Sequence, residues 1–197
     1  TLADICTGCS SNDLIGASAT ISFGTAVSAP LTVSLQNGAT FSFLYRHQQE
    51  QGTTRWLNEV RARSAFYLRL GPRVGYAYPV IATRLAVGAM DGPLPDNLSV
   101  GGVSSGAAEL AFVQTVGTFR TFPVRGYPSG AARGRRAATA TVEYRVPLAL
   151  IGKSLGHLPF GADKVAFAVF GDIGNAWDPG ESARLNQLRS FGAELVA

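Results

Sequence analysis

The chain has 197 residues, which fits one large domain or part of a bigger protein, and its composition of 46% hydrophobic and 15% charged residues excludes intrinsic disorder. No run of about 18 apolar residues occurs, which excludes a transmembrane helix, and the 23 glycines, 10 prolines and many Thr, Val, Tyr and Phe residues favour β-strands. The formal net charge is +4, but the one basic cluster, Arg133-Gly134-Arg135-Arg136, reads as a solvated loop end and does not favour nucleic-acid binding.

Alternation of polar and apolar residues predicts about seven strands. They span residues 14–27, 31–47, 54–68, 74–89, 137–149, 164–177 and 187–197. Asn37-Gly38 has the sequence of a two-residue hairpin turn, but the apolar alternation continues across it. We therefore predict one long strand from about Leu31 to His47 with a kink or bulge at Gly38. Tight connections at 28–30 and 70–73 alternate with longer polar ones such as 48–53.

The two cysteines form the C-x-x-C pair Cys6 and Cys9. No second ligand pair completes a zinc site, and no βαβ pattern follows to make a redox motif, so we favour a small disulfide in an exposed loop of an exported protein. No signal peptide precedes Thr1, and we expect the chain to be a piece of a longer precursor.

No motif of an enzyme or a metal site stands out in the sequence. His47 and His157 have no companion ligands nearby, and no G-x-S-x-G nucleophile motif occurs. We therefore expect no metal, no cofactor and no enzymatic activity.

The polar faces of the predicted strands decide between a soluble sandwich and a membrane barrel. They carry Arg61, Arg63, Glu143, Arg145 and Asp172. Burying these charges between two sheets would be costly, whereas the water-filled interior of a barrel hydrates them. Strands of about 11 residues or more, rising about 3.3 Å per residue, are long enough for an apolar band about 25 Å tall. We therefore predict an all-β fold, a transmembrane antiparallel up-and-down β-barrel. An odd strand number cannot close such a barrel, so the chain is expected to be part of one.

Four motifs in the second half of the chain occur in a characteristic order. They are Val124-Arg125-Gly126-Tyr127, Val142-Glu143-Tyr144-Arg145-Val146-Pro147-Leu148, Val169-Phe170-Gly171-Asp172-Ile173-Gly174-Asn175-Ala176-Trp177 and Leu188-Arg189-Ser190-Phe191-Gly192-Ala193-Glu194-Leu195. With this spacing the chain resembles the bacterial surface antigen family of outer-membrane barrels, which comprises BamA-like insertases and two-partner secretion transporters. The resemblance covers about Leu98 to Ala197, and the upstream hairpins match only by pattern.

The resemblance implies a sixteen-stranded barrel preceded by periplasmic polypeptide-transport-associated domains. Residues 1–197 would form the C-terminal part of that barrel, with strands eight to fourteen, and residues 90–136 would form a long extracellular loop that folds into the lumen. By resemblance, the loop tip with Arg125, Gly126 and Tyr127 is latched to the wall acids Glu143 and Asp172. One guanidinium can bridge two carboxylates, a geometry that lysine does not match. Gly126 is expected to let the backbone approach the wall, with Tyr127 packed beside it.

One feature departs from the pattern of the family, which places a Gly-Gly pair a few residues before the tip. Gly101-Gly102 lies much further upstream of Val124. Either residues 103–122 are an insertion, with the apolar run from Ala107 to Val116 adding a short hairpin or helix, or Gly101-Gly102 is not the counterpart.

The resemblance also implies a location and a task. We expect a protein of the outer membrane of a Gram-negative-type bacterium that inserts or translocates other polypeptides without enzymatic chemistry. Its partners would be the lipid bilayer, unfolded outer-membrane or secreted polypeptides, periplasmic domains and accessory lipoproteins, and not nucleic acid. The alternative is a barrel that serves as a membrane anchor or pore for an appended domain. A soluble β module that binds a ligand is a third reading.

Overall fold

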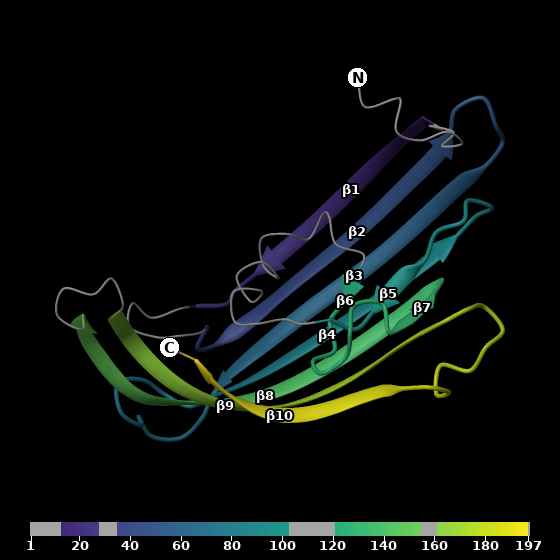
Figure 1. Cartoon of the computed structure of the whole chain (residues 1–197). Helices are drawn as coiled ribbons and strands as arrows, with labels where there is room; N and C mark the ends of the chain where they lie inside the picture. Colours follow the sequence, from purple (N-terminus) through teal and green to yellow (C-terminus); the bar gives the residue numbers. More distant parts are fainter. Residues whose placement is uncertain (1–12, 28–34, 103–120, 155–160, 197) are drawn as a thin grey trace.

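The computed structural model describes residues 13–27, 35–102, 121–154 and 161–196 (Figure 1). Seven strands form one sheet: β1 (Leu14–Gly24), β2 (Gly38–Glu50), β3 (Trp56–Arg69), β4 (Val80–Asp91), β8 (Arg136–Ser154), β9 (Gly161–Trp177) and β10 (Leu188–Val196). Their order is β1-β2-β3-β4-β8-β9-β10, and all neighbours are antiparallel. The connection between β4 and β8 holds a second sheet with the order β6-β5-β7, built from β5 (Leu98–Val100), β6 (Thr121–Phe122) and β7 (Ala132–Gly134).

The predicted all-β fold with seven antiparallel strands is confirmed, while its closure into a barrel is not seen. β1 and β10 are the two edges of an open sheet in the part of the chain that the structure describes. None of the described residues forms a helix long and apolar enough to cross a membrane.

The predicted start of the second strand differs from the structure. Gly38, not Leu31, begins β2 and pairs with Tyr67, so Asn37-Gly38 is not a hairpin turn. Asn37 pairs with Val27 in an isolated bridge, and Gly38 has a φ of 111°, so the backbone is irregular there, as the predicted kink required. Residues 28–34 lie outside the described part of the chain.

The predicted start of the fourth strand was wrong. β4 begins at Val80, because residues 70–79 form a longer turn of their own. Val74 and Ala77 pair in an isolated bridge around Gly75, which has a φ of 60°. The Arg73 side chain donates two hydrogen bonds to the carbonyl of Tyr76 and closes this turn. Such local side-chain capping of a turn leaves no period in the sequence.

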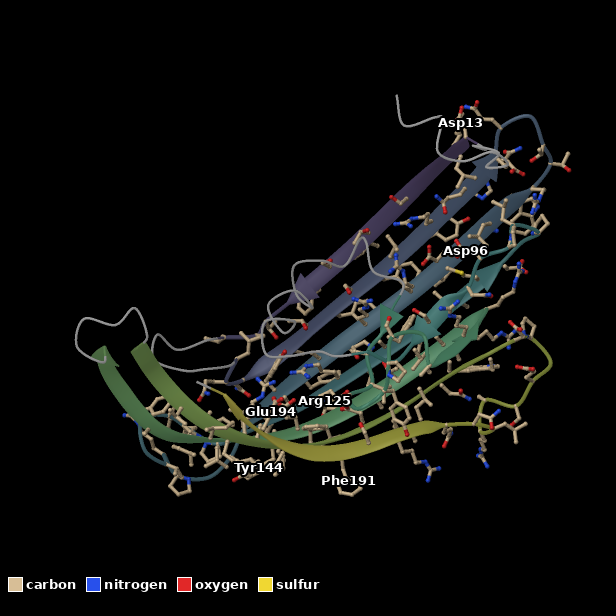
Figure 2. The ribbon with its side chains drawn as sticks, in the orientation of Figure 1. Asp13, Asp96, Arg125, Tyr144, Phe191 and Glu194 are labelled. Atoms are coloured by element: carbon tan, nitrogen blue, oxygen red, sulfur yellow. The ribbon has the colours of Figure 1, made fainter. Side chains whose placement is uncertain are left out.

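The sheet is a single curved layer, and the small sheet β6-β5-β7 lies on its concave side (Figure 1). Figure 2 shows Tyr144 and Phe191 on the convex side and Arg125 and Glu194 on the concave side. The pairing register extends this division to the other strands, because paired residues point to the same face. Exposed apolar residues of the convex face are Ile21, Phe23, Phe41, Tyr45, Val60, Phe66, Leu68, Leu85, Val87, Val142, Phe167, Val169, Ile173 and Leu195.

The largest apolar core lies between the concave face and the connection from β4 to β8. Its buried residues are Leu57, Ala86, Met90, Leu94, Leu98, Val100, Phe122, Val124 and Ala137. Two glycines of the sheet make room for it. A Cβ atom on Gly88 would lie 2.6 Å from Cζ of Phe122, and one on Gly174 would lie 2.7 Å from Cγ2 of Val124. The small sheet is therefore seated directly on the backbone of β4 and β9.

Candidate functional site at the inner loop

The connection from β4 to β8, residues 92–135, is called the inner loop here, and its tip is built beside Gly101 and Gly102. The N–H of Gly101 donates to the carbonyl of Phe122, and the N–H of Gly102 donates to that of Tyr127. Gly102 also pairs with Val124 in an isolated bridge. Both glycines have positive φ values, 116° and 95°, which favour glycine.

The glycine pair thus lies against the tip in space although it is far upstream in sequence. The insertion of residues 103–122 relative to the family pattern stays a prediction. Residues 103–120, which include the apolar run from Ala107 to Val116, lie outside the described residues, so the predicted hairpin or helix is not described.

The structure brings Arg125 together with Glu143 of β8 and Asp172 of β9. Nε and Nη2 of Arg125 donate to Oδ2 and Oδ1 of Asp172, each at 2.9 Å, and Nη1 donates to Oε2 of Glu143 at 3.2 Å. The backbone N–H of Arg125 also donates to Oδ2 of Asp172, at 3.1 Å. Arg125 is 8% exposed and Glu143 is 1% exposed. The guanidinium therefore joins β8 and β9 through buried, charge-assisted hydrogen bonds.

Other charged side chains extend this contact into a network. Oε2 of Glu143 also lies 3.5 Å from Nη1 of Arg84, and Oε1 of Glu143 accepts a hydrogen bond from Nε of Arg145. Oε1 of Glu194 on β10 lies 3.8 Å from Nη1 of Arg125. We call these residues the Arg125 cluster: Arg84, Arg125, Arg145, Glu143, Asp172 and Glu194. Among the described residues it combines three cations with three anions, which offsets much of the cost of placing each charge there.

Burial and charge act in opposite directions on the guanidinium of Arg125. Burial alone would lower its pKa, because desolvation disfavours the charged form. The hydrogen bonds and charge of Asp172, with the charges of Glu143 and Glu194, outweigh burial and raise the pKa of Arg125 above its usual value. The tip therefore stays cationic.

An aromatic platform lies under the guanidinium. Cζ of Arg125 is 3.3 Å from the centroid of the Phe170 ring, which is a cation–π stack. The ring lies over Gly192 of β10, where an added Cβ would be 2.7 Å from Cζ of Phe170. Gly192 thus leaves space for the ring, and the ring gives the guanidinium a surface to stack on.

Gly126 and Tyr127 act differently from the expectation. An added Cβ on Gly126 would meet only Cβ of Ser190, at an ordinary 3.8 Å, so close approach to the wall is not what requires glycine. Its φ of 82° requires it instead. The hydroxyl of Tyr127 donates to the carbonyl of Arg189 at 3.0 Å and accepts from its N–H at 3.3 Å, so Tyr127 bonds to β10 and not to the acids.

Sequence reasoning missed Glu194, Phe170 and Gly192. A signal for Glu194 was present, because it shares the parity of Ser190 and Gly192 on the inner face of the last strand. Its distance to Arg125 depends on β10 lying next to β9, which parity alone does not state. The stack on Phe170 left no local signal, since an aromatic residue on a strand is usually part of an apolar face.

The remaining predicted positions lie elsewhere. Cys6 and Cys9 fall outside the described residues. Nδ1 of His47 lies 2.7 Å from Oδ1 of Asn58, within hydrogen-bonding distance. No group of three His, Cys, Asp or Glu side chains suited to a metal ion occurs in the described ranges.

The arrangement binds the inner loop to β8, β9 and β10 by ion pairs, a cation–π stack, hydrogen bonds and apolar packing. It is a non-covalent attachment of the loop to the concave face of the sheet. No protein-family model and no curated protein matches the chain.

Proposed function

We propose that this chain is part of an outer-membrane β-barrel of the bacterial surface antigen type, which inserts or translocates other polypeptides. The observation that carries the proposal is the attachment of Arg125 to Glu143 and Asp172 on the concave side of a one-layer sheet, whose convex side carries exposed apolar residues in the described part of the chain.

The two faces of the sheet support a membrane location. Water is a poor solvent for a continuous apolar face, and monomeric soluble proteins rarely expose one of this kind. A bilayer covers it, while the charges of the concave side stay in a hydrated interior. β1, the shortest of the first four strands, has 11 residues. At about 3.4 Å per residue and a tilt of about 45°, it spans about 26 Å, which matches the apolar band of such barrels.

The two open edges support further strands in the complete barrel. Each unpaired backbone N–H or C=O group costs roughly several kcal/mol in hydrocarbon. Open edges such as those of β1 and β10 therefore do not persist in a bilayer. A barrel of sixteen strands, in which the described ones are numbers eight to fourteen, removes both edges. The rim that carries the inner loop would face the outside of the cell.

The proposed task follows from what the loop can do inside such a barrel. Polypeptide insertion or translocation needs an interior whose contents can be rearranged and a strand seam that opens, and neither step needs a cofactor or a covalent intermediate. The Arg125 cluster holds the inner loop on the wall while this happens. The partners are then the bilayer, unfolded outer-membrane or secreted polypeptides, and periplasmic domains with accessory lipoproteins.

Reconstitution of the full-length protein tests this proposal. The protein is placed in lipid vesicles, a urea-unfolded outer-membrane barrel is added, and its folding is followed by heat-modifiable gel mobility. We expect faster folding than in empty vesicles, and slower folding with Arg125→Ala. Transport of a secreted polypeptide into the vesicles is measured in parallel.

Two results would contradict the proposal. Extraction of the full-length protein from membranes without detergent would show a soluble β module. Stable insertion with no effect on folding or transport, accompanied by ion conductance alone, would identify the barrel as an anchor or pore for an appended domain.

A further inference from the structure

The Tyr127 hydroxyl bonds to both backbone groups of one residue on the edge strand. It donates to the carbonyl of Arg189 and accepts from the N–H of the same residue. This is the pair of contacts that a neighbouring β-strand makes with a residue in an antiparallel ladder. The phenol therefore substitutes for a strand at this position.

The direction of these bonds locates the phenol. In an antiparallel strand the N–H and C=O of one residue point to the same side, and successive residues alternate. Among the described strands β10 pairs only with β9, and Arg189 lies opposite Ile173 in that ladder. Since both groups of Arg189 bond to Tyr127, they point away from β9. The phenol of Tyr127 thus occupies the open edge of β10, where a following strand would bond.

Other contacts make the tip sensitive to the position of β10. Glu194 lies near Arg125, and the hydroxyl of Ser190 lies 3.5 Å from Oδ2 of Asp172, which Arg125 also binds. The tip is therefore connected to the edge strand through its inner face as well as through its edge.

We propose that Tyr127 is an edge stop: its hydroxyl holds the pairing position at Arg189, so that a strand added to β10 pairs only with Phe191, Ala193 and Leu195. Those residues have the parity of Arg189, so their backbone groups also point to the open edge. The inference rests on the proposed barrel, because it requires the sheet to continue beyond β10.

The strand that takes this edge is the next strand of the same barrel. Phe191 is 92% exposed and Leu195 is 66% exposed on the convex face, while Glu194 lies on the concave face. A neighbour with the same apolar-outside, polar-inside alternation continues both faces without a break. Release of the inner loop then frees one more pairing position, so the seating of the loop and the length of the strand contact are coupled.

Backbone hydrogen exchange in the full-length protein, held in detergent micelles without any client polypeptide, tests the edge stop. We expect slow exchange at the Arg189 amide. Exchange should be about fivefold to tenfold faster with Tyr127→Phe, which keeps the ring but loses both hydrogen bonds of the hydroxyl, including the one that the Arg189 amide donates. The amides of Phe191 and Leu195 should stay protected in both proteins. Tyr45→Phe is the control, because the Tyr45 hydroxyl lies on the convex face and bonds to Asn58.

Several results would overturn the inference. Equal protection of Arg189 in the wild type and in Tyr127→Phe would mean that a strand pairs there instead of the phenol. Fast exchange of Arg189 in the wild type would mean that the phenol does not hold it. Protection of Phe191 and Leu195 only after addition of an unfolded client would assign the edge to another polypeptide. None of these readings depends on the folding assay, so the edge stop and the insertion activity can fail separately.

Discussion

Gly88 on β4 provides the sharpest test of how the inner loop is seated. A Cβ atom added there would lie 2.6 Å from Cζ of Phe122 and 2.9 Å from Cδ1 of Leu98. Carbon atoms in contact are normally about 3.5–4.0 Å apart, so Gly88→Ala shortens both contacts by roughly 1 Å. Phe122 and Leu98 are fully buried in the same apolar core, so moving either side chain displaces its neighbours. We expect the strain to lift the inner loop from the sheet.

The size of the effect follows from the cost of overpacking. An extra methyl group in a well-packed core costs about 1–3 kcal/mol. The backbone of Gly88 does not lie in the left-handed region, so alanine adds no conformational strain of its own. If this cost falls on the seated state of the loop, the population of the unseated state rises about fivefold to 150-fold.

Limited proteolysis measures that population. The full-length protein in lipid vesicles is treated with trypsin, and the initial rate of cleavage within residues 92–135 is recorded. When opening and closing are fast, this rate is proportional to the open population. We expect cleavage of Gly88→Ala about fivefold to 150-fold faster than wild type. Gly171→Ala is the matched control, because the nearest atom to its added Cβ is the carbonyl oxygen of Ser190 at 4.0 Å.

A second variant separates this explanation from general destabilisation. Leucine at position 122 lacks the ring atoms that approach Gly88, so Phe122→Leu should reduce the cost of Gly88→Ala when the two are combined. Cleavage of Gly88→Ala at the wild-type rate, or strictly additive effects in the double variant, would refute the view that the loop is seated on β4 by close packing.

Three further predictions concern the Arg125 cluster and the convex face. Arg125→Ala leaves Asp172 and Glu143 without their shared guanidinium. Breaking a buried ion pair costs about 3–5 kcal/mol, and water in the interior lowers this cost. Tryptic cleavage after Arg133, a site that the variant keeps, should therefore rise at least tenfold, and an unchanged rate would disprove the attachment of the loop by Arg125. Glu194→Gln removes the acid at 3.8 Å from Arg125 but leaves the hydrogen bonds of Arg125 to Asp172 and Glu143. Cleavage in the same assay should therefore rise less than fivefold. An effect as large as that of Arg125→Ala would contradict the weaker role of this contact. Val87→Arg places a charge on the convex face, which costs about 2–4 kcal/mol near the middle of a bilayer. The free energy of unfolding in urea, measured in vesicles, should fall by that amount, while Val142→Ile should leave it unchanged. An arginine that is tolerated at this position would argue against lipid contact.

The strands and their faces were predictable because they depend on a local period. Side chains in a strand alternate between two sides whatever surrounds it, so the parity of Glu143 and Asp172 on the inner face could be stated before any partner was known. The turn over residues 70–79 was not predictable in this way. Its bridge and the contacts of Arg73 depend on local geometry that has no period.

The contacts of the site follow a different rule. Arg125 and Asp172 are 47 residues apart, and only the motif resemblance brought them together at the level of sequence. Neither the place of Tyr127 on the edge of β10 nor the stack of Arg125 on Phe170 has a sequence pattern, since both require the inner loop to reach across three strands.

By itself the amino-acid sequence determined the class of structure: strands rather than helices, one apolar face and one charged face, and a single arginine at the tip of a glycine-rich connection. These are properties of neighbouring residues, and backbone geometry converts them directly into local structure. Only the tertiary structure decided that the connection forms its own small sheet, that Gly88 and Gly174 leave space for it, and that Glu194 and the edge of β10 belong to the site. Those facts depend on which distant segments come into contact, and that outcome is set by packing and strand order together.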